Sequence, residues 1–181
     1  TTIVNAYQPS LTNRGTGSNM GEADVLEVFS IYGRQTTSSA ELSRVLIKFP
    51  VNTISTDRTN GVIPASGSVS FYLRMHDAQH SKTIPRDFKL AVLSVSQSWE
   101  EGIGLDLEGY EDKTFGKIGC NWMSASKTTY WTDKSGQLLA GGSYHTSSTA
   151  SEEVFLLTQS FSTGIEDLEL DITPLVEQWI A

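Results

Sequence analysis

Cysteine is almost absent from this chain of 181 residues. Cys120 is the single cysteine, so no disulfide can form within the chain. A reducing compartment is the simpler expectation, although many secreted proteins also lack disulfides. A domain of this length buries about 70% of the surface that its unfolded chain exposes, so it needs no covalent staple to fold.

Long hydrophobic runs are also missing. No stretch approaches the ~18 consecutive apolar residues of a membrane-spanning helix, so we expect no membrane partner. The opening residues do not show the basic region and apolar segment of a secretory signal peptide. Neither a G-x-S-x-G nucleophile motif nor a G-x-x-x-x-G-K-[ST] phosphate loop occurs, so we expect no enzyme of those classes.

Basic residues are scarce. The chain has 13 Lys and Arg against 21 Asp and Glu, which gives a net charge of −8. The basic residues do not cluster, and a partner bound through phosphates requires such a cluster, so no nucleic-acid partner is expected. The acidity is concentrated in SWEEGIGLDLEGYED, residues 98–112.

Alternation of apolar and polar residues is the dominant pattern. In SVSFYLRMH, residues 68–76, every second side chain is apolar, which is typical of a half-buried strand. The same period predicts strands in VLEVFSIYG, RVLIKFPV, DFKLAVLSVSQSW, EEVFLLTQSF and EDLELDI. Gly, Ser, Thr and Asn fill the segments between them, including STDRTNG, and indicate turns and loops.

One short helix is predicted, at residues 173–181. Thr173 is suited to capping its first turn, and Pro174 suits the first helical position. Leu175 and Trp179 then fall on one apolar face.

These elements predict an all-β protein, specifically an antiparallel β-sandwich of jelly-roll type closed by the short C-terminal helix. No internal repeat or linker interrupts the sequence, so we expect one domain over residues 1–181. Within it, residues 1–20 are expected to form an extended N-terminal arm or first strand.

The acidic stretch permits three interpretations. Calcium takes about six to eight oxygen ligands. The candidate ligands in this stretch are Glu100, Asp106, Glu108, Glu111 and Asp112. Their spacing is not that of an EF-hand. A catalytic pair of carboxylates is the second interpretation. A solvated acidic loop is the third and is favoured, because any acidic loop offers such pairs. We therefore expect no cofactor, with a structural calcium ion as the alternative.

Exposed aromatic residues are the other candidate contact site. Tyr130 and Trp131 lie in the polar segment SKTTYWTDKSG, so they are predicted to be the best-exposed aromatic pair. Tyr110 lies in the acidic stretch and is a third candidate. Such residues either pack on the edge of the domain or contact a protein or a glycan, and the sequence leaves both alternatives open.

An ordered set of motifs carries a resemblance to a known family. RVLIKF, residues 44–49, supplies an R-x-L-x-x-F element, and a later strand runs into Trp99 and Glu100. An Asn-Trp pair follows at residues 121–122, and DITPLVEQW, residues 171–179, closes the chain. In this order, over nearly the whole chain, the motifs resemble the DNRLRE-type domain, a β-sandwich related to carbohydrate-binding modules.

The carboxylate-rich segment between Trp99 and Trp122 is similar to the version of this domain found in tailed-bacteriophage virion proteins. The chain departs from the family at Asn5, where the family has Asp, and in residues 127–151, which form a longer segment. These departures leave any ligand site of the family without direct support here.

The resemblance implies a non-enzymatic virion structural protein that decorates or cements the head, or belongs to the neck, the tail or a fibre. Its implied partners are copies of itself and other virion proteins, and its implied location is the virion, after assembly in the host bacterial cytoplasm. The alternative is a carbohydrate-binding module that recognises a polysaccharide through exposed aromatic residues. A glycoside hydrolase or lyase is a third class.

Overall fold

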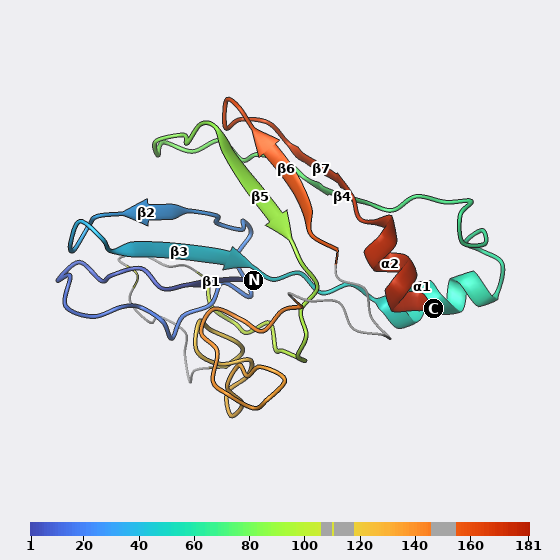
Figure 1. Ribbon diagram of the computed structural model, residues 1–181, viewed down its shortest axis with the longest axis horizontal. Coiled ribbons are helices and arrows are strands. Elements are labelled where there is room, and N and C mark those ends of the chain that lie inside the picture. The colour runs from blue at the N-terminus through green and yellow to red at the C-terminus, as the bar shows by residue number, and fades with distance from the viewer. Residues whose placement is uncertain (106–109, 111–117, 146–154) are drawn as a thin grey trace. The chain divides into compact units, whose positions relative to one another are not determined.

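The structure is a computed structural model that describes residues 1–105, 110, 118–145 and 155–181 (Figure 1). The chain divides into two compact units. Unit 1 comprises Thr1–Lys48 and Val95–Tyr144, and unit 2 comprises Phe49–Ser94 and His145–Ala181. The expectation of one domain over residues 1–181 stays a prediction.

The chain is built mostly from strands, with two short helices, and the coarse expectation of an all-β protein agrees with this. In chain order the elements are β1 (Thr2–Val4), β2 (Ser30–Tyr32), β3 (Ala40–Val45), α1 (Val51–Thr59), β4 (Tyr72–Met75), β5 (Phe88–Val92), β6 (Leu157–Phe161), β7 (Leu168–Asp171) and α2 (Thr173–Ile180). Within the described residues these strands form one three-stranded and two two-stranded sheets, without a closed sandwich or jelly roll. In the same residues, neither helix has the length and apolar character needed to cross a membrane.

The three-stranded sheet lies in unit 1 and has the order β1-β3-β2, with both pairs antiparallel. The N-terminal segment, expected as an arm or first strand, supplies β1, and Ile3 and Val4 are fully buried. The chain then turns back, since Tyr7 pairs with Arg14 in an isolated bridge. Residues 1–20 therefore fold onto their own unit in this structure.

The core of unit 1 is aromatic. Trp99, Trp122 and Trp131 are all buried, and Ile3, Leu46, Cys120 and Ala125 complete the cluster. A tryptophan buries about 150–250 Å² of surface, so these three side chains contribute a large apolar area to the core of unit 1.

Unit 2 contains the two-stranded sheets β4-β7 and β5-β6. The predicted alternation in β7 is confirmed, because Leu168 is buried while Glu169 is exposed. Phe88 of β5 and Phe161 of β6 lie directly opposite each other and stack, with ring centroids 4.8 Å apart. Cross-strand aromatic pairs of this kind are a principal source of stability in a two-stranded sheet.

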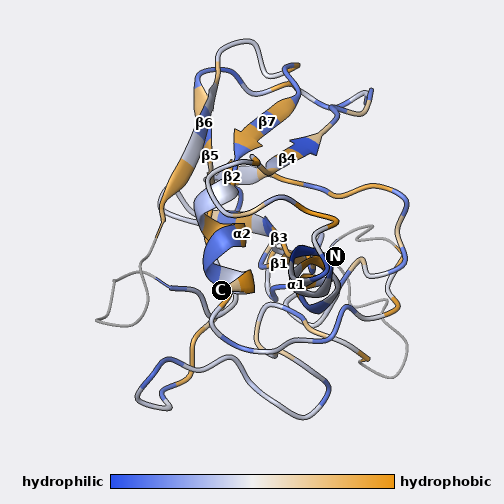
Figure 2. Cartoon of the chain, turned by 90° about the vertical axis from the view of Figure 1, so that its right-hand side faces the viewer, coloured by the Kyte–Doolittle hydropathy of each residue, from blue (hydrophilic) through white to orange (hydrophobic). Residues whose placement is uncertain are grey.

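Helix α2 lies where the sequence predicted a short helix, with Pro174 in its first turn. It carries both hydrophobic and hydrophilic residues (Figure 2), and Leu175 and Val176 are its buried residues. Thr173 does not cap the helix as predicted. Its hydroxyl instead accepts a hydrogen bond of 2.8 Å from the N–H of Phe71, which joins the helix start to the strand region before β4.

Helix α1 was not predicted, because STDRTNG was read as a loop. No residue of α1 is buried, so the apolar periodicity that reveals most helices is missing. The helix is held from outside. Arg58 forms two hydrogen bonds with the carboxylate of Glu177 on α2, at 3.0 and 2.8 Å, and Phe49 stacks on Trp179 with ring centroids 6.3 Å apart.

Candidate functional site

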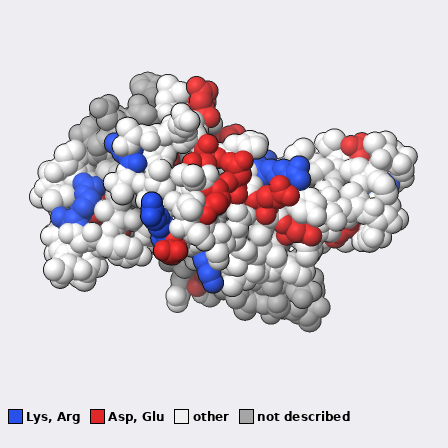
Figure 3. All heavy atoms as spheres, turned by 90° about the horizontal axis from the view of Figure 1, so that it is seen from above, with Lys and Arg blue, Asp and Glu red and all other residues white. Residues whose placement is uncertain are grey.

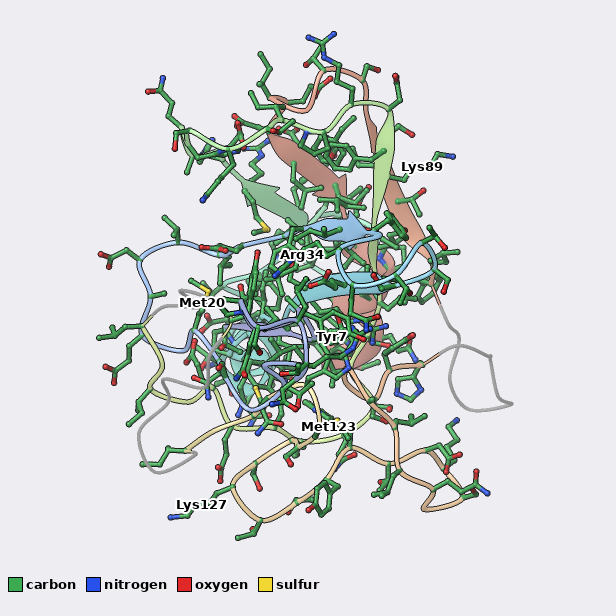
Figure 4. All side chains as sticks on the ribbon, turned by 90° about the vertical axis from the view of Figure 1, so that its left-hand side faces the viewer. Tyr7, Met20, Arg34, Lys89, Met123 and Lys127 are labelled. Carbon is green, nitrogen blue, oxygen red and sulfur yellow. The ribbon has the colours of Figure 1, made fainter. Side chains whose placement is uncertain are left out.

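Tyr130 lies at the mouth of a polar recess in unit 1. Its side chain is 56% exposed, and its backbone carbonyl accepts a hydrogen bond of 2.9 Å from the side chain of Gln97. The recess has a volume of about 300 Å³ and is lined by Thr16, Gly17, Asn121, Met123, Ser124, Lys127 and Tyr130. Figure 4 shows Met123 and Lys127 on the loops at this end of the unit, with Lys127 reaching into solvent. An exposed ring beside amide, hydroxyl and ammonium groups is suited to a polar ligand.

Trp131 does not share this exposure, and the prediction of an exposed Tyr130-Trp131 pair is wrong for the tryptophan. Its side chain is fully buried, and its indole N–H donates a hydrogen bond of 2.8 Å to the carbonyl of Asn121. Alternation explains the difference, because Tyr130 pairs with Ser124 in a bridge and consecutive side chains of an extended segment point to opposite faces.

Tyr110 is half-buried and does not line this recess. Its ring packs on Phe29, with centroids 5.5 Å apart, and the Arg34 guanidinium lies 5.2 Å from its ring centroid. Burial raises the pKa of the Tyr110 hydroxyl, and the nearby Arg34 charge opposes part of this rise. A Cβ on Gly15 would collide with the Tyr110 carbonyl, so only glycine fits at position 15. Tyr110 therefore belongs to a packed cluster with Phe29, Val4 and Met20.

A buried ionic network lies beneath this cluster. The Glu41 carboxylate on β3 is fully buried, and its Oε2 accepts hydrogen bonds from the Tyr7 N–H at 2.6 Å and from Arg34 at 3.1 Å. Arg34 also donates a hydrogen bond of 3.0 Å to the Tyr7 carbonyl. Figure 4 shows Tyr7 and Arg34 within this unit. The network ties the turn after β2 to the N-terminal segment.

The acidic stretch is described in part. Glu100 and Glu101 are exposed, while the predicted calcium ligands Asp106, Glu108, Glu111 and Asp112 lie outside the described residues. Among the residues that the structure describes, no group of three or more His, Cys, Asp or Glu side chains is arranged to hold a metal ion. The start of the stretch is fixed by Asn19, whose Oδ1 accepts a hydrogen bond of 2.9 Å from the Gly104 N–H.

Cys120 is a packed core residue. It is fully buried, and its N–H donates a hydrogen bond of 2.8 Å to the carbonyl of Glu100. Burial raises the pKa of its thiol to about 12, so the thiolate needed for nucleophilic chemistry is not formed near neutral pH.

A site that the sequence did not reveal lies along β2. The Phe29 carbonyl accepts a hydrogen bond of 3.1 Å from Ser43, and the Gly33 N–H donates one of 2.9 Å to Ser39. Backbone groups on every second residue of an antiparallel strand face the same neighbour. The N–H and C=O groups of residues 28, 30 and 32 therefore face away from β3, where no partner lies among the described residues.

Large apolar side chains accompany these outward backbone groups. Tyr32 is 74% exposed and Val28 is 49% exposed, and Val25 and Leu26 are exposed just before them. We call the outward backbone groups of residues 28–32, with the side chains of Val28 and Tyr32, the β2 edge. The sequence VLEVFSIYG predicted a strand here, but periodicity does not distinguish an edge strand from a central one.

Comparisons with protein-family models, with curated proteins and with solved structures each return no match. The resemblance to DNRLRE-type domains is therefore a hypothesis that rests on the sequence motifs, and the site must be interpreted from its own geometry.

Proposed function

We propose that this chain is a non-enzymatic structural protein of a bacteriophage virion that acts through protein–protein contacts. It serves as head decoration or cement, or as part of the neck, the tail or a fibre, and its partners are copies of itself and other virion proteins. The observation that carries the proposal is the β2 edge, whose outward backbone groups have no partner among the described residues and lie beside the exposed side chains of Val28 and Tyr32.

An open edge with apolar side chains favours an assembly protein for a physical reason. Free N–H and C=O groups on a strand are a template for another chain, and proteins that stay monomeric protect them. Contiguous exposed apolar residues likewise indicate a surface that another molecule covers. The motif resemblance to tailed-phage proteins supplies the kind of assembly.

The test is the protein content of purified particles. Particles of the source phage are separated from free protein on a density gradient and analysed by quantitative mass spectrometry. We expect the chain in the particle fraction, at a fixed ratio to the major capsid protein and retained after a high-salt wash. Recovery only among free proteins, or a gene located beside polysaccharide lyases and away from portal, capsid and tail genes, would contradict the proposal.

A second candidate function is glycan binding at the Tyr130 recess. The specific observation is an exposed ring beside Asn121, Lys127 and Thr16, in a recess of about 300 Å³. Sugars present hydroxyls at their edges and C–H groups on their faces, and such a set of amide, hydroxyl and aromatic groups matches both.

Glycan-array binding tests this candidate. We expect Tyr130→Ala to abolish any signal, whereas Tyr72→Ala, at an exposed tyrosine of β4 in unit 2, leaves it unchanged. Trp131 is unsuitable for this test because it is buried in the core. Equal signals from both variants would exclude the recess as a glycan site.

A further inference from the structure

The β2 edge has the geometry that accepts an added strand. Residues 28, 30 and 32 direct N–H and C=O groups outward at the spacing of one antiparallel or parallel partner. Strand addition obtains affinity from such main-chain hydrogen bonds and specificity from alternate side chains. Val28 and Tyr32 supply the alternate side chains. Both are exposed, and each lies two residues from Ser30, so the three side chains share one face of the strand.

The charge around this edge indicates what binds there. Glu22, Asp24 and Glu27 are all exposed and precede β2, and no Lys or Arg lies between residues 22 and 33. The chain as a whole is also acidic, since its net charge is −8, and Figure 3 shows acidic side chains gathered on the face of the molecule seen from above. A partner strand with Lys or Arg at the end beside Asp24 and Glu27 would complement this charge, whereas an acidic one would be repelled.

A second copy of this chain fits the edge less well. Pairing two β2 strands antiparallel places residues 33–36 of one copy beside the acidic residues of the other. The cation in that segment, Arg34, is already bound to Glu41 and Tyr7, so it is not offered to Glu27. Charged residues beside an edge commonly act against self-pairing, and these acids have that effect.

We propose that the β2 edge binds an extended segment of another virion protein, with alternating apolar side chains and a Lys or Arg facing Asp24 and Glu27. This inference rests on the proposed function, because it names the chemistry of the partner in the assembly. The added strand forms main-chain hydrogen bonds with residues 28, 30 and 32, and its apolar side chains cover Val28 and Tyr32.

Two capped peptides test the proposal by isothermal titration calorimetry against the full chain. One alternates valine and threonine with lysine at both ends, and the other has glutamate in place of lysine. We expect the basic peptide to bind at least about tenfold more tightly than the acidic one. The difference should shrink in 1 M salt, where the screening length falls to about 3 Å.

Variants connect the binding to the edge. Tyr32→Lys places a like charge against the basic peptide and removes apolar contact, so we expect at least about tenfold weaker binding. Val28→Lys should weaken binding of the basic peptide in the same way from a second position of the β2 edge. The matched control is Tyr72→Lys, the same change at an exposed tyrosine of β4, which should leave binding unchanged. The double variant Asp24→Lys/Glu27→Lys should reverse the preference towards the acidic peptide.

Each other outcome overturns the proposal. The proposal of a basic partner strand is contradicted if the two peptides bind equally or if neither binds. It is also contradicted if Tyr32→Lys and Tyr72→Lys lose the same amount of affinity. A concentration-dependent dimer that Tyr32→Lys dissociates, measured by analytical ultracentrifugation, identifies a second copy as the occupant instead. If the chain is nevertheless found in particles, the proposed function stands and only this inference fails. If the chain is absent from particles but the edge binds basic strands, the proposed function fails alone.

Discussion

At the scale of single residues, Cys120 offers a direct test of the packing in unit 1. Its side chain is fully buried and the pKa of its thiol is raised to about 12, first by burial. We expect the native protein to react with DTNB at least about a hundredfold more slowly than the protein in 6 M guanidinium. In the native protein burial disfavours the reactive thiolate and also keeps the reagent away from the sulfur. Rapid reaction of the native protein would show that this core is open.

The Glu41 network gives a second residue-scale prediction. Removing one partner of a buried ion pair leaves the other charge uncompensated. Arg34→Met should therefore lower the free energy of unfolding by about 3 kcal/mol, the lower end for buried pairs because Arg34 is partly exposed. Urea unfolding followed by circular dichroism measures the change.

The double variant Arg34→Met/Glu41→Met is the control for this prediction. It removes the buried carboxylate as well, so it should recover most of the lost stability. A double variant less stable than Arg34→Met alone would show that the network contributes through the hydrogen bond to the Tyr7 N–H more than through charge.

Residue patterns in the sequence predicted apolar burial better than polar burial. Leu175 is buried as expected, because it falls on the apolar face of the predicted C-terminal helix. Glu41 is buried in the middle of β3, where its type predicts exposure, and hydrogen bonds from Arg34 and from the N–H of the distant Tyr7 make that position tolerable. Pairing between distant residues is not readable from one sequence.

At the scale of elements, α2 buries Leu175, which is 1% exposed. Truncating a buried leucine removes apolar contact and leaves a cavity, so Leu175→Ala should lower the free energy of unfolding by about 2–5 kcal/mol. Leu156→Ala is the matched control in unit 2, since that leucine is 65% exposed, and it should change stability by less than about 0.5 kcal/mol. Thermal unfolding measured side by side separates the two outcomes.

The turn between β6 and β7 predicts a dependence of stability on pH. The Glu166 carboxylate accepts hydrogen bonds from the N–H groups of Ser162, Thr163 and Gly164, at 2.9, 2.8 and 2.7 Å. These bonds lower the pKa of Glu166 from 4.5 to about 2, and the bond from the Thr163 N–H has the largest effect. Because the folded pKa is the lower one, the stabilisation is complete above pH 4.5 and is lost as the pH falls towards 2.

Glu166→Gln provides the measurement. The variant should unfold at lower urea concentration than the parent at pH 6, and the gap should narrow as the pH approaches 2, where the parent carboxyl is protonated. A gap of equal size at both pH values would show that the carboxylate charge plays no part.

The sequence located the strands of unit 2 and α2 because their side chains alternate or repeat against a core. It missed α1 because nothing in that helix is buried, and the helix depends on Arg58 reaching Glu177 far along the chain. Its ends were nevertheless marked, since Pro50 precedes it and Gly61 follows with a positive φ of 74°. For β2 the sequence predicted the strand correctly, but it did not show that the strand lies at the edge of its sheet.

At the scale of the whole molecule, a bound calcium ion would be detected through its effect on the stability of the folded chain. A cation bound only by the folded chain stabilises it in proportion to its occupancy. We expect EDTA, and calcium added afterwards, to change the melting temperature by less than about 1 °C, since a solvated loop is favoured for the acidic stretch. A drop of several degrees that calcium restores would assign a calcium site to Glu100 and its acidic neighbours.

The division of the tryptophans between the units gives the chain built-in optical reporters. Trp99, Trp122 and Trp131 all lie in the core of unit 1, and Trp179 lies on α2 in unit 2, against Phe49. Indole emission shifts to longer wavelength when water reaches the ring. Trp179→Phe therefore leaves an emission spectrum that reports unit 1 alone, and subtracting it from the parent spectrum isolates unit 2. Melting of the two units can thus be followed separately in one intact, unlabelled chain.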